Sequence, residues 1–270
     1  MFGLGLRHTH FNDIINRLEE DPSSLQVDFY EVITENFFET NGRPLKVLEK
    51  IREHFPISFH GVSMSIASKD EIDFNYLEKL KRLEDRIDPF LVSDHLCWTG
   101  LKGKNLHNLL PFPYTKENLK FIASKIQTIQ EFLKRPLMLE NLSAYIAFKD
   151  SIMSESQFLQ ELHKETGCKL VLDLNNLYVN SQNQNFNPEK WLQEIPSAAV
   201  HEIHLAGFSD MGSFLFDTHS CPVWDPVWEL YKNNKAKFPE AVTLIEWDEN
   251  IPTYEELILE VKKAKHYGSL

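Results

Sequence analysis

The sequence of 270 residues has few cysteines, no excess of basic residues and no long apolar run. Its three cysteines, Cys97, Cys168 and Cys221, form neither a disulfide framework nor a Cys-x-x-Cys zinc motif. Reduced thiols and a cytoplasmic location are therefore expected. The N-terminal residues lack the apolar core of a signal peptide. No segment approaches the roughly 20 apolar residues that span a bilayer, so no membrane contact is predicted.

Positive charge is also scarce. Lysine and arginine number 28 against 40 aspartates and glutamates, a net charge of −12. This balance disfavours nucleic acid as a partner, because DNA and RNA binding usually requires a basic face. It suits a site that gathers cations, and it equally suits an ordinary acidic surface. The sequence contains no catalytic triad pattern, no P-loop and no dinucleotide-binding glycine motif.

What the chain does contain is a regular alternation of strand-like and helix-like segments. The predicted strands are Gly3–Arg7, Asp28–Ile33, Ile57–Val62, Phe90–Leu96, Leu137–Asn141, Lys169–Asn175, Val200–Ala206 and Val242–Asp248. Helical spacing of apolar residues is clearest over Thr115–Leu133, and a long loop is expected around Asn105–Pro111. Eight strand–helix repeats of this total length predict a (β/α)8 TIM barrel, one domain over residues 1–270. A doubly wound open sheet is the alternative.

Metal-capable side chains stand at the ends of these strands. The segment Val200–His219 shows this best: His204 and Glu202 share one face of an extended strand, whereas His201 lies on the other. Because active sites of TIM barrels lie at the C-terminal ends of the strands, we expect such residues to converge on one rim. The predicted ligands are His60, His95, Glu140, Asp173, His204, Asp217, His219 and Glu246.

Each of these residues alone has an ordinary structural explanation, such as a core histidine or a carboxylate in an ion pair. Together they are four imidazoles and four carboxylates, and the strand ends supply no lysine or arginine to balance them. Buried carboxylates are costly unless they are paired or bind metal. Mixed imidazole and carboxylate ligands favour Fe, Mn or Zn over Ca or Mg. The ligands outnumber what one ion uses, so a centre of two or three ions is plausible.

Several stretches resemble one family along the whole chain. They are FHGVSMS (Phe59–Ser65), SDHLCWTG (Ser93–Gly100), NLHNLLPFPY (Asn105–Tyr114), LEN (Leu139–Asn141), LDLNNLYV (Leu172–Val179), HLAG (His204–Gly207), DTH (Asp217–His219) and EWD (Glu246–Asp248). In combination they are similar to the multinuclear non-haem iron-dependent oxidative enzymes, which include the oxidase of methanobactin biosynthesis. SDHLCWTG and NLHNLLP most resemble members that modify cysteines of copper-binding peptides. Cys221 is a departure from many relatives.

The resemblance implies a TIM barrel that binds two or three iron ions and uses O2 as co-substrate. It implies oxidation of cysteine residues in a ribosomally made precursor peptide, usually with a partner protein that recognises the leader of that peptide. The family's ligand positions match the eight residues found at the strand ends. Four further residues are candidates for orienting a ligand or contacting substrate: Asp94, Asn176, His107 and His201. Helix packing is the ordinary explanation for His201, and loop exposure for His107.

Three other functions fit a metal-binding barrel. A divalent-metal sugar isomerase or epimerase gathers similar ligands but usually needs a lysine or second carboxylate to move protons, and no lysine stands at a strand end. A metal-dependent endonuclease is disfavoured by the acidic charge. A non-catalytic metal-binding protein would not turn over a peptide. Metal analysis separates these functions from an iron oxidase.

Overall fold

The strands close into a barrel. The structure is a computed structural model that describes residues 1–269, and its parallel strands pair in the circular order β1-β12-β9-β8-β7-β4-β3-β2. The barrel strands are β1 (Phe2–Gly5), β2 (Phe29–Ile33), β3 (Ile57–Gly61), β4 (Leu91–His95), β7 (Met138–Glu140), β8 (Lys169–Asp173), β9 (Val200–Leu205) and β12 (Val242–Ile245). The predicted (β/α)8 barrel is confirmed, and the open sheet is excluded.

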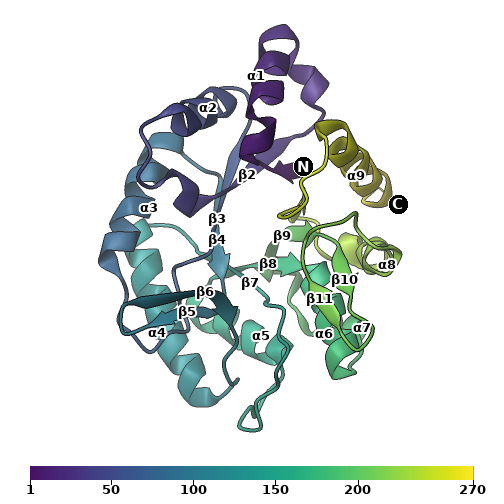
Figure 1. Ribbon diagram of the computed structural model, residues 1–270. Helices are drawn as coiled ribbons and strands as arrows, with labels where there is room; N and C mark the ends of the chain where they lie inside the picture. The colour runs from purple at the N-terminus through teal and green to yellow at the C-terminus, as the bar shows by residue number, and fades with distance from the viewer. Residues whose placement is uncertain (270) are drawn as a thin grey trace.

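Helices surround the barrel (Figure 1). The α-helices are α1 (Phe11–Glu20), α2 (Arg43–Arg52), α3 (Phe74–Ile87), α4 (Lys116–Leu133), α5 (Glu155–Thr166), α6 (Leu174–Gln184), α7 (Pro188–Glu194), α8 (Asp225–Asn234) and α9 (Tyr254–Tyr267). Short 3-10 helices cover His8–His10, Pro22–Leu25, Thr34–Phe37, Ser197–Ala199 and Lys235–Lys237. Over residues 1–269, every helix is too short or too polar to cross a membrane.

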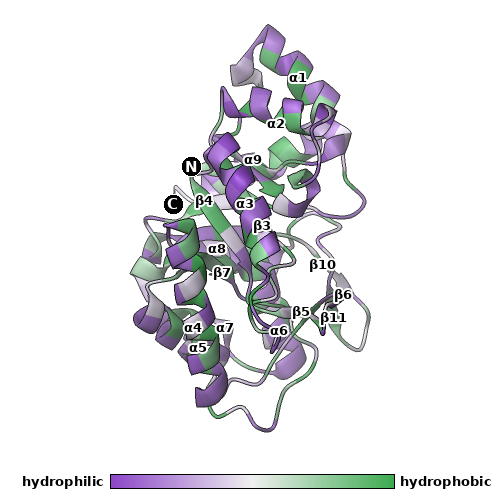
Figure 2. Ribbon diagram, turned by 90° about the vertical axis from the view of Figure 1, so that its left-hand side faces the viewer, coloured by the Kyte–Doolittle hydropathy of each residue, from purple (hydrophilic) through white to green (hydrophobic). Residues whose placement is uncertain are grey.

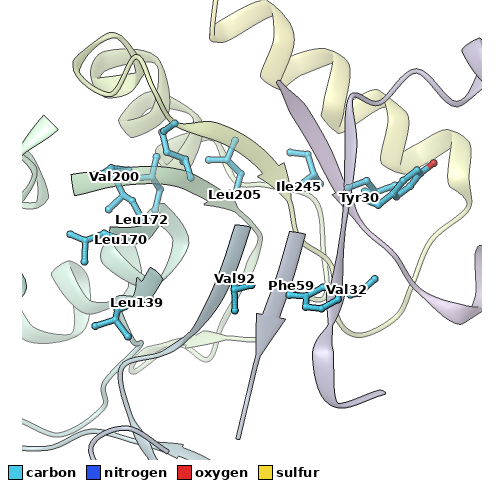
Figure 3. Packing of buried hydrophobic residues seen from close by; sticks show 14 of the residues in the cluster. Tyr30, Val32, Phe59, Val92, Leu139, Leu170, Leu172, Val200, Leu205 and Ile245 are labelled. Carbon is cyan, nitrogen blue, oxygen red and sulfur yellow. The ribbon is translucent and has the colours of Figure 1, made fainter. Parts of the chain in front are cut away.

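The core lies between the strands and the helices. Alternate residues of each strand point outward, and most of these are apolar and almost fully buried. Figure 3 shows such side chains, among them Val32, Phe59, Val92, Leu139 and Leu205. Burial of this layer supplies most of the drive for folding. It also leaves the inward-facing positions free to carry polar residues, and the site is built from those positions.

Two antiparallel hairpins lie outside the barrel, where the sequence had predicted only loops. β5 (Trp98–Leu101) pairs with β6 (Lys104–Leu110), and β10 (Phe208–Asp210) pairs with β11 (Leu215–Asp217). Lys102 and Gly103 connect β5 and β6 with φ angles of 54° and 71°, the left-handed pair typical of tight hairpin turns. The loop prediction for Asn105–Pro111 was wrong because the exposed β6 has no apolar alternation and is set by its turn and partner strand. Figure 2 shows both hairpins on the side of the barrel opposite the N-terminus.

The sixth predicted strand was too long at its end. β8 ends at Asp173, and α6 begins at Leu174, a helix that the sequence did not reveal. The Asp173 carboxylate caps this helix by accepting a hydrogen bond of 2.6 Å from the backbone N–H of Asn176. An aspartate at the junction therefore ends the strand and starts the helix in one residue. As a result Asn175 and Asn176 lie on the first turn of α6, above the barrel mouth.

Candidate metal centre

The inward-facing residues form three layers along the barrel axis. The floor is apolar and contains Phe29, Val242 and Leu244. The middle layer is polar and contains Glu31, Ser58 and Glu202, with exposed fractions of 4% or less. The upper layer contains His60, His95, Glu140, Asp173, His204 and Glu246, each at the C-terminal end of its strand or directly after it. The barrel register brings these strand ends together, with His95 opposite Glu140 and Asp173 opposite His204.

One carboxylate oxygen lies at the centre of a group of imidazoles. Glu140 Oε2 is 2.9 Å from His60 Nε2 and 3.4 Å from His95 Nε2. The other nitrogen of each ring is held from behind: His60 Nδ1 lies 2.7 Å from Ser93 Oγ, and His95 Nδ1 lies 3.0 Å from the Gly61 carbonyl oxygen. Such contacts fix the orientation of an imidazole and direct its free nitrogen inward. His60, His95 and Glu140 thus present three ligand atoms to one point.

A second group surrounds Glu246. Its Oε2 lies 3.0 Å from His204 Nδ1 and 3.2 Å from His219 Nδ1. Asp173 Oδ2 lies 3.7 Å from His219 Nε2, on the other side of that ring. Ligand atoms of Glu140, Asp173, His204 and Glu246 all lie within 4.8 Å of one another. Because Glu140 belongs to both groups, the two sites adjoin and a carboxylate stands between them.

The hairpin β10–β11 delivers the last two predicted ligands. Asp217 ends β11, not a loop as predicted, and its Oδ1 lies 2.7 Å from His219 Nε2. Its carboxylate also accepts hydrogen bonds from Asn175 Nδ2 (2.7 Å) and Ser143 Oγ (2.9 Å). His219 has a φ of 45°, an uncommon backbone conformation for a residue with a side chain. Strain of this kind is often found where a functional side chain must be aimed.

The buried charges perturb one another strongly. Burial alone would lower the pKa of His60, but the carboxylates of Glu140 and Glu31 raise it to about 10. Burial opposes ionisation of Glu140, whereas His95 and His60 lower its pKa to about 2. Burial raises the pKa of Asp173 well above its usual range. In the absence of metal, protons must therefore occupy part of the space among these groups.

The unsatisfied polar atoms of the cluster indicate what kind of ligand the site binds. Among the described residues, buried atoms that form no hydrogen bond of acceptable geometry include His60 Nε2, Glu140 Oε2, Asp173 Oδ2, His204 Nε2 and His219 Nε2. Some of them lie close together all the same, as His60 Nε2 and Glu140 Oε2 do at 2.9 Å. No lysine or arginine forms an ion pair with Glu140, Asp173, Asp217 or Glu246 in the part of the chain that the structure covers. Two ligands about 2.1 Å from one ion and at right angles are about 3 Å apart. The observed separations match this spacing, so the residues fit bound metal ions.

Of the four further candidates for orienting a ligand or contacting substrate, only Asn176 contacts a predicted ligand. Asn176 lies in the site and donates from Nδ2 to Glu140 Oε1 at 3.3 Å. Asp94 is buried but accepts from the Met64 N–H and the Tyr76 hydroxyl, so the Gly61 carbonyl and not Asp94 orients His95. His107 is exposed on β6, and His201 is half-buried on the outer face of β9. Neither His107 nor His201 reaches the cluster.

Sequence reasoning missed three carboxylates near the predicted ligands. Glu31 and Glu202 lie in the middle layer beneath His204, and Asp248 Oδ2 lies 3.4 Å from His219 Nδ1. Asp248 also forms an ion pair with Arg7. The period-two alternation places Glu31 and Glu202 on inward faces, and this signal was available. It gave no reason to treat them as neighbours, because their strands are not adjacent in the barrel.

A cleft of about 420 Å³ opens above the cluster. His60, His95 and His219 lie at its base, and Leu110, Ile146 and Phe216 line its sides. The β5–β6 hairpin bounds it on one side, where Trp98 Nε1 donates to the Pro111 carbonyl oxygen. The β10–β11 hairpin bounds it on the other side. The cleft is large enough for one or two amino-acid side chains, and apolar side chains form part of its walls.

Asn176 offers a test of the site that leaves every predicted ligand in place. Asn176→Ala removes the amide that holds Glu140, so we expect metal affinity to fall by about 10- to 100-fold. Competition with a chromogenic chelator measures this change. The control is Asn234→Ala, a buried asparagine on α8 that makes two hydrogen bonds far from the cleft. Equal affinity in wild type and Asn176→Ala would contradict a role for Asn176 in orienting the ligand.

Comparison with known proteins identifies the family. A family model described as "RiPP precursor modification enzyme MbnB/TglH/ChrH" matches residues 1–269. The chain belongs to this family. RiPPs are ribosomally synthesised and post-translationally modified peptides, so the family comprises enzymes that act on peptide precursors. The resemblance drawn from the sequence is thereby confirmed.

Individual relatives share the whole length of the chain but carry no functional name. A UPF0276 protein of Caulobacter vibrioides is 46% identical over 264 residues, which cover 98% of this chain and 92% of the relative. A UPF0276 protein of Rhizorhabdus wittichii is 46% identical over 265 residues, covering 98% and 94%. These relatives support the family assignment, but their names do not indicate a substrate.

Similar solved structures share the fold alone. D-psicose 3-epimerase from Clostridium cellulolyticum superposes with a TM-score of 0.63 at 9% identity, covering 98% of this chain and 96% of the other. Endonuclease IV from Thermus thermophilus superposes with a TM-score of 0.63 at 12% identity, covering 98% of each. At such identities the match establishes the barrel architecture and says nothing about the reaction.

Proposed function

We propose that the protein is a multinuclear iron- and O2-dependent oxidase that modifies cysteine residues of a ribosomally synthesised precursor peptide. The observation that carries the proposal is the cluster of orphaned imidazole and carboxylate atoms at the barrel mouth, in a chain that belongs to a family of peptide-modifying enzymes. Imidazole and carboxylate ligands without thiolate favour iron, manganese or zinc. Among these metals, iron is the one that the family resemblance indicates.

The residues divide into two adjoining ligand groups. His60, His95 and Glu140 would hold one ion, and Glu140, Asp173, His204 and Glu246 would hold a second. Asp217 and His219 extend the cluster toward the cleft, where a third ion would lie. A carboxylate shared between two groups can bridge two cations, which is the role that we assign to Glu140. Two or three iron ions are therefore expected.

Bound iron would supply the one-electron and dioxygen chemistry that side chains lack. The protein's own contribution is geometry. Ser93 and the Gly61 carbonyl fix the rings of His60 and His95, and Asn176 fixes Glu140. Apolar side chains on the cleft walls would contact the peptide, and the open mouth between the hairpins would admit a peptide segment. A cysteine side chain entering the cleft reaches the base, where the ligand atoms lie.

The proposed partners follow from this activity. The substrate is a cysteine-containing precursor peptide, and a separate protein is expected to recognise its leader. The cleft holds only a short segment of peptide, so residues distant from the cysteine must be bound elsewhere. Co-purification of this protein with the product of a neighbouring gene tests that expectation.

The experiment is a single-turnover reaction. Protein reconstituted with Fe²⁺ under anaerobic conditions is mixed with the precursor peptide and its partner protein, and then exposed to air. The expected result is a defined mass change at a cysteine, together with the loss of one free thiol. A matched peptide with serine in place of that cysteine should stay unchanged. An unmodified cysteine peptide, with iron content and partner verified, would overturn the proposal.

Metal content distinguishes the alternatives. A sugar epimerase or a metal-dependent nuclease would retain activity with manganese, magnesium or zinc in the absence of dioxygen. No lysine lines the cleft within residues 1–269, so an epimerase would have to move protons with a carboxylate that does not bind the metal. A protein that binds iron and leaves every peptide unaltered would be a metal-binding protein only.

A further inference from the structure

The middle layer of the barrel contains two carboxylates without a lysine or arginine partner. Glu31 is 4% exposed and Glu202 is 0% exposed, and their side chains meet across the barrel interior. Ser58 Oγ lies between them, 3.2 Å from Glu31 Oε2 and 3.3 Å from Glu202 Oε2. The apolar residues Phe29, Val242 and Leu244 pack together in a separate buried cluster of the barrel interior. No lysine or arginine forms an ion pair with either glutamate in the described part of the chain.

The hydrogen bonds available to Glu31 and Glu202 do not satisfy all of their carboxylate oxygens. Ser58 has one hydroxyl hydrogen, so it donates to only one of the two carboxylates at a time. Glu202 Oε1 is buried and has no hydrogen-bond partner. Buried carboxylates in this state are destabilising unless a proton or a cation neutralises them. No side chain of the middle layer itself is cationic, and the nearest groups that can carry positive charge are the imidazoles of His204 and His60 above it.

His204 completes the group from above. Its Nδ1 faces the upper layer, 3.0 Å from Glu246 Oε2, whereas its Nε2 faces downward and lies 3.6 Å from Glu31 Oε1. This separation is too long for a hydrogen bond, and His204 Nε2 has no hydrogen-bond partner. It fits two ligands that share one ion, since atoms about 2.1 Å from a tetrahedral ion are about 3.4 Å apart. Ligand atoms of Glu31, Glu202 and His204 all lie within 4.8 Å of one another.

We infer that Glu31, Glu202 and His204 hold an additional transition-metal cation in the barrel interior, beneath the ions of the upper layer. His204 then links the two levels through its two nitrogens. Binding of the deep ion forms a bond to Nε2 and breaks the N–H bond there, and the proton leaves to water. The ring becomes a bridging imidazolate, and the ion neutralises the carboxylates. This deep site goes beyond the proposed oxidase activity and requires neither peptide nor dioxygen.

The position of the site predicts slow exchange. Glu202 and His204 are fully buried and Glu31 nearly so, and the cleft is lined by the upper ligands, so a deep ion enters first and leaves last. A chelator should therefore remove metal in two phases, with the slow phase belonging to the deep ion. Manganese is a suitable probe, because it binds mixed imidazole and carboxylate ligands and does not depend on the redox chemistry.

The test counts manganese per chain. Wild type, Glu31→Gln and Glu202→Gln are loaded with Mn²⁺, desalted and analysed by mass spectrometry of the metal. Each glutamine variant should hold one equivalent less than wild type and should lose the slow chelation phase. The control is Glu84→Gln, a buried glutamate on α3 paired with Arg135, which should match wild type.

If a variant fails to fold, crystals of the manganese-loaded wild type provide a second test of the deep site. An anomalous difference peak at the manganese edge should lie among Glu31, Glu202 and His204. A map with peaks in the upper layer and none below His204 would overturn the inference, as would full manganese content in folded Glu202→Gln. A proton shared by the carboxylates would then be what neutralises them. None of these measurements uses peptide, so failure of the oxidase proposal leaves them unaffected.

Discussion

Replacing Glu140 by glutamine is expected to remove bound metal and to lower peptide modification by more than about 100-fold. Glu140 Oε2 lies 2.9 Å from His60 Nε2 and 4.0 Å from His204 Nδ1, so one atom serves both ligand groups. Glutamine has nearly the same shape but no negative charge, and its NH2 group cannot ligate. Loss of this one charge therefore weakens two adjacent sites at once. Metal analysis after reconstitution and product mass spectrometry measure the two effects.

The matched control for this variant is again Glu84→Gln. Glu84 is also buried, but Arg135 and Lys81 balance its charge outside the barrel. It should keep both full metal content and wild-type turnover. His204→Ala should resemble Glu140→Gln in losing metal. If Glu140→Gln and His204→Ala both retained the full complement of iron, the ligand assignment would be wrong even if activity fell.

The second large effect is an unusual pH dependence of stability in the metal-free protein. Burial raises the pKa of Glu202 to about 8, from an ordinary value of 4.5, and Glu31 adds to this shift. Burial likewise raises the pKa of Asp94 to about 8 from 3.8. The carboxylates of Glu140 and Glu31 overcome burial and raise the pKa of His60 to about 10 from 6.5. Each of these groups holds its proton more tightly when folded.

The sign of the effect follows from proton linkage. A group whose pKa is raised on folding contributes stability that is complete below its unfolded pKa and is lost as the pH rises through its folded pKa. Glu202 and Asp94 lose their contribution up to about pH 8, and His60 between about pH 6.5 and 10. Glu140 acts in the opposite direction, because its pKa is lowered to about 2 and its contribution is lost only as the pH falls from about 4.5 toward that value. The metal-free protein should thus be most stable near pH 5 and less stable at pH 9.

Thermal unfolding at pH 5, 7 and 9 checks this expectation. Metal should reverse the trend, because cations and protons compete for the same ligands and metal affinity rises as protons leave. The metal-loaded protein should therefore gain in unfolding temperature over the metal-free protein, and the gain should be larger at pH 9 than at pH 5. Glu202→Gln should flatten part of the slope of the metal-free protein. A metal-free protein that is equally stable at pH 5 and pH 9 would contradict the buried charges described above.

Local sequence patterns were sufficient to predict the barrel and the side chains that gather at its rim. Regular alternation of strand and helix patterns is a local property, and it is sufficient to predict parallel strands and their common C-terminal rim. The period of two along each strand likewise places His204 and Glu202 inward and His201 outward, as the structure shows. These predictions depend only on residues close together in the chain, and this is why they succeeded.

Which of these side chains meet depends on the packing of the closed barrel. The β5–β6 and β10–β11 hairpins, the α6 helix after Asp173 and the approach of Glu31 to Glu202 depend on partners distant in the sequence. Closure of the barrel sets the register between strands, and the register places Glu140 Oε2 between two groups of imidazoles and turns the two nitrogens of His204 toward different layers. Local patterns specify the direction of a side chain, but the distance between two side chains is fixed only when their strands are packed together.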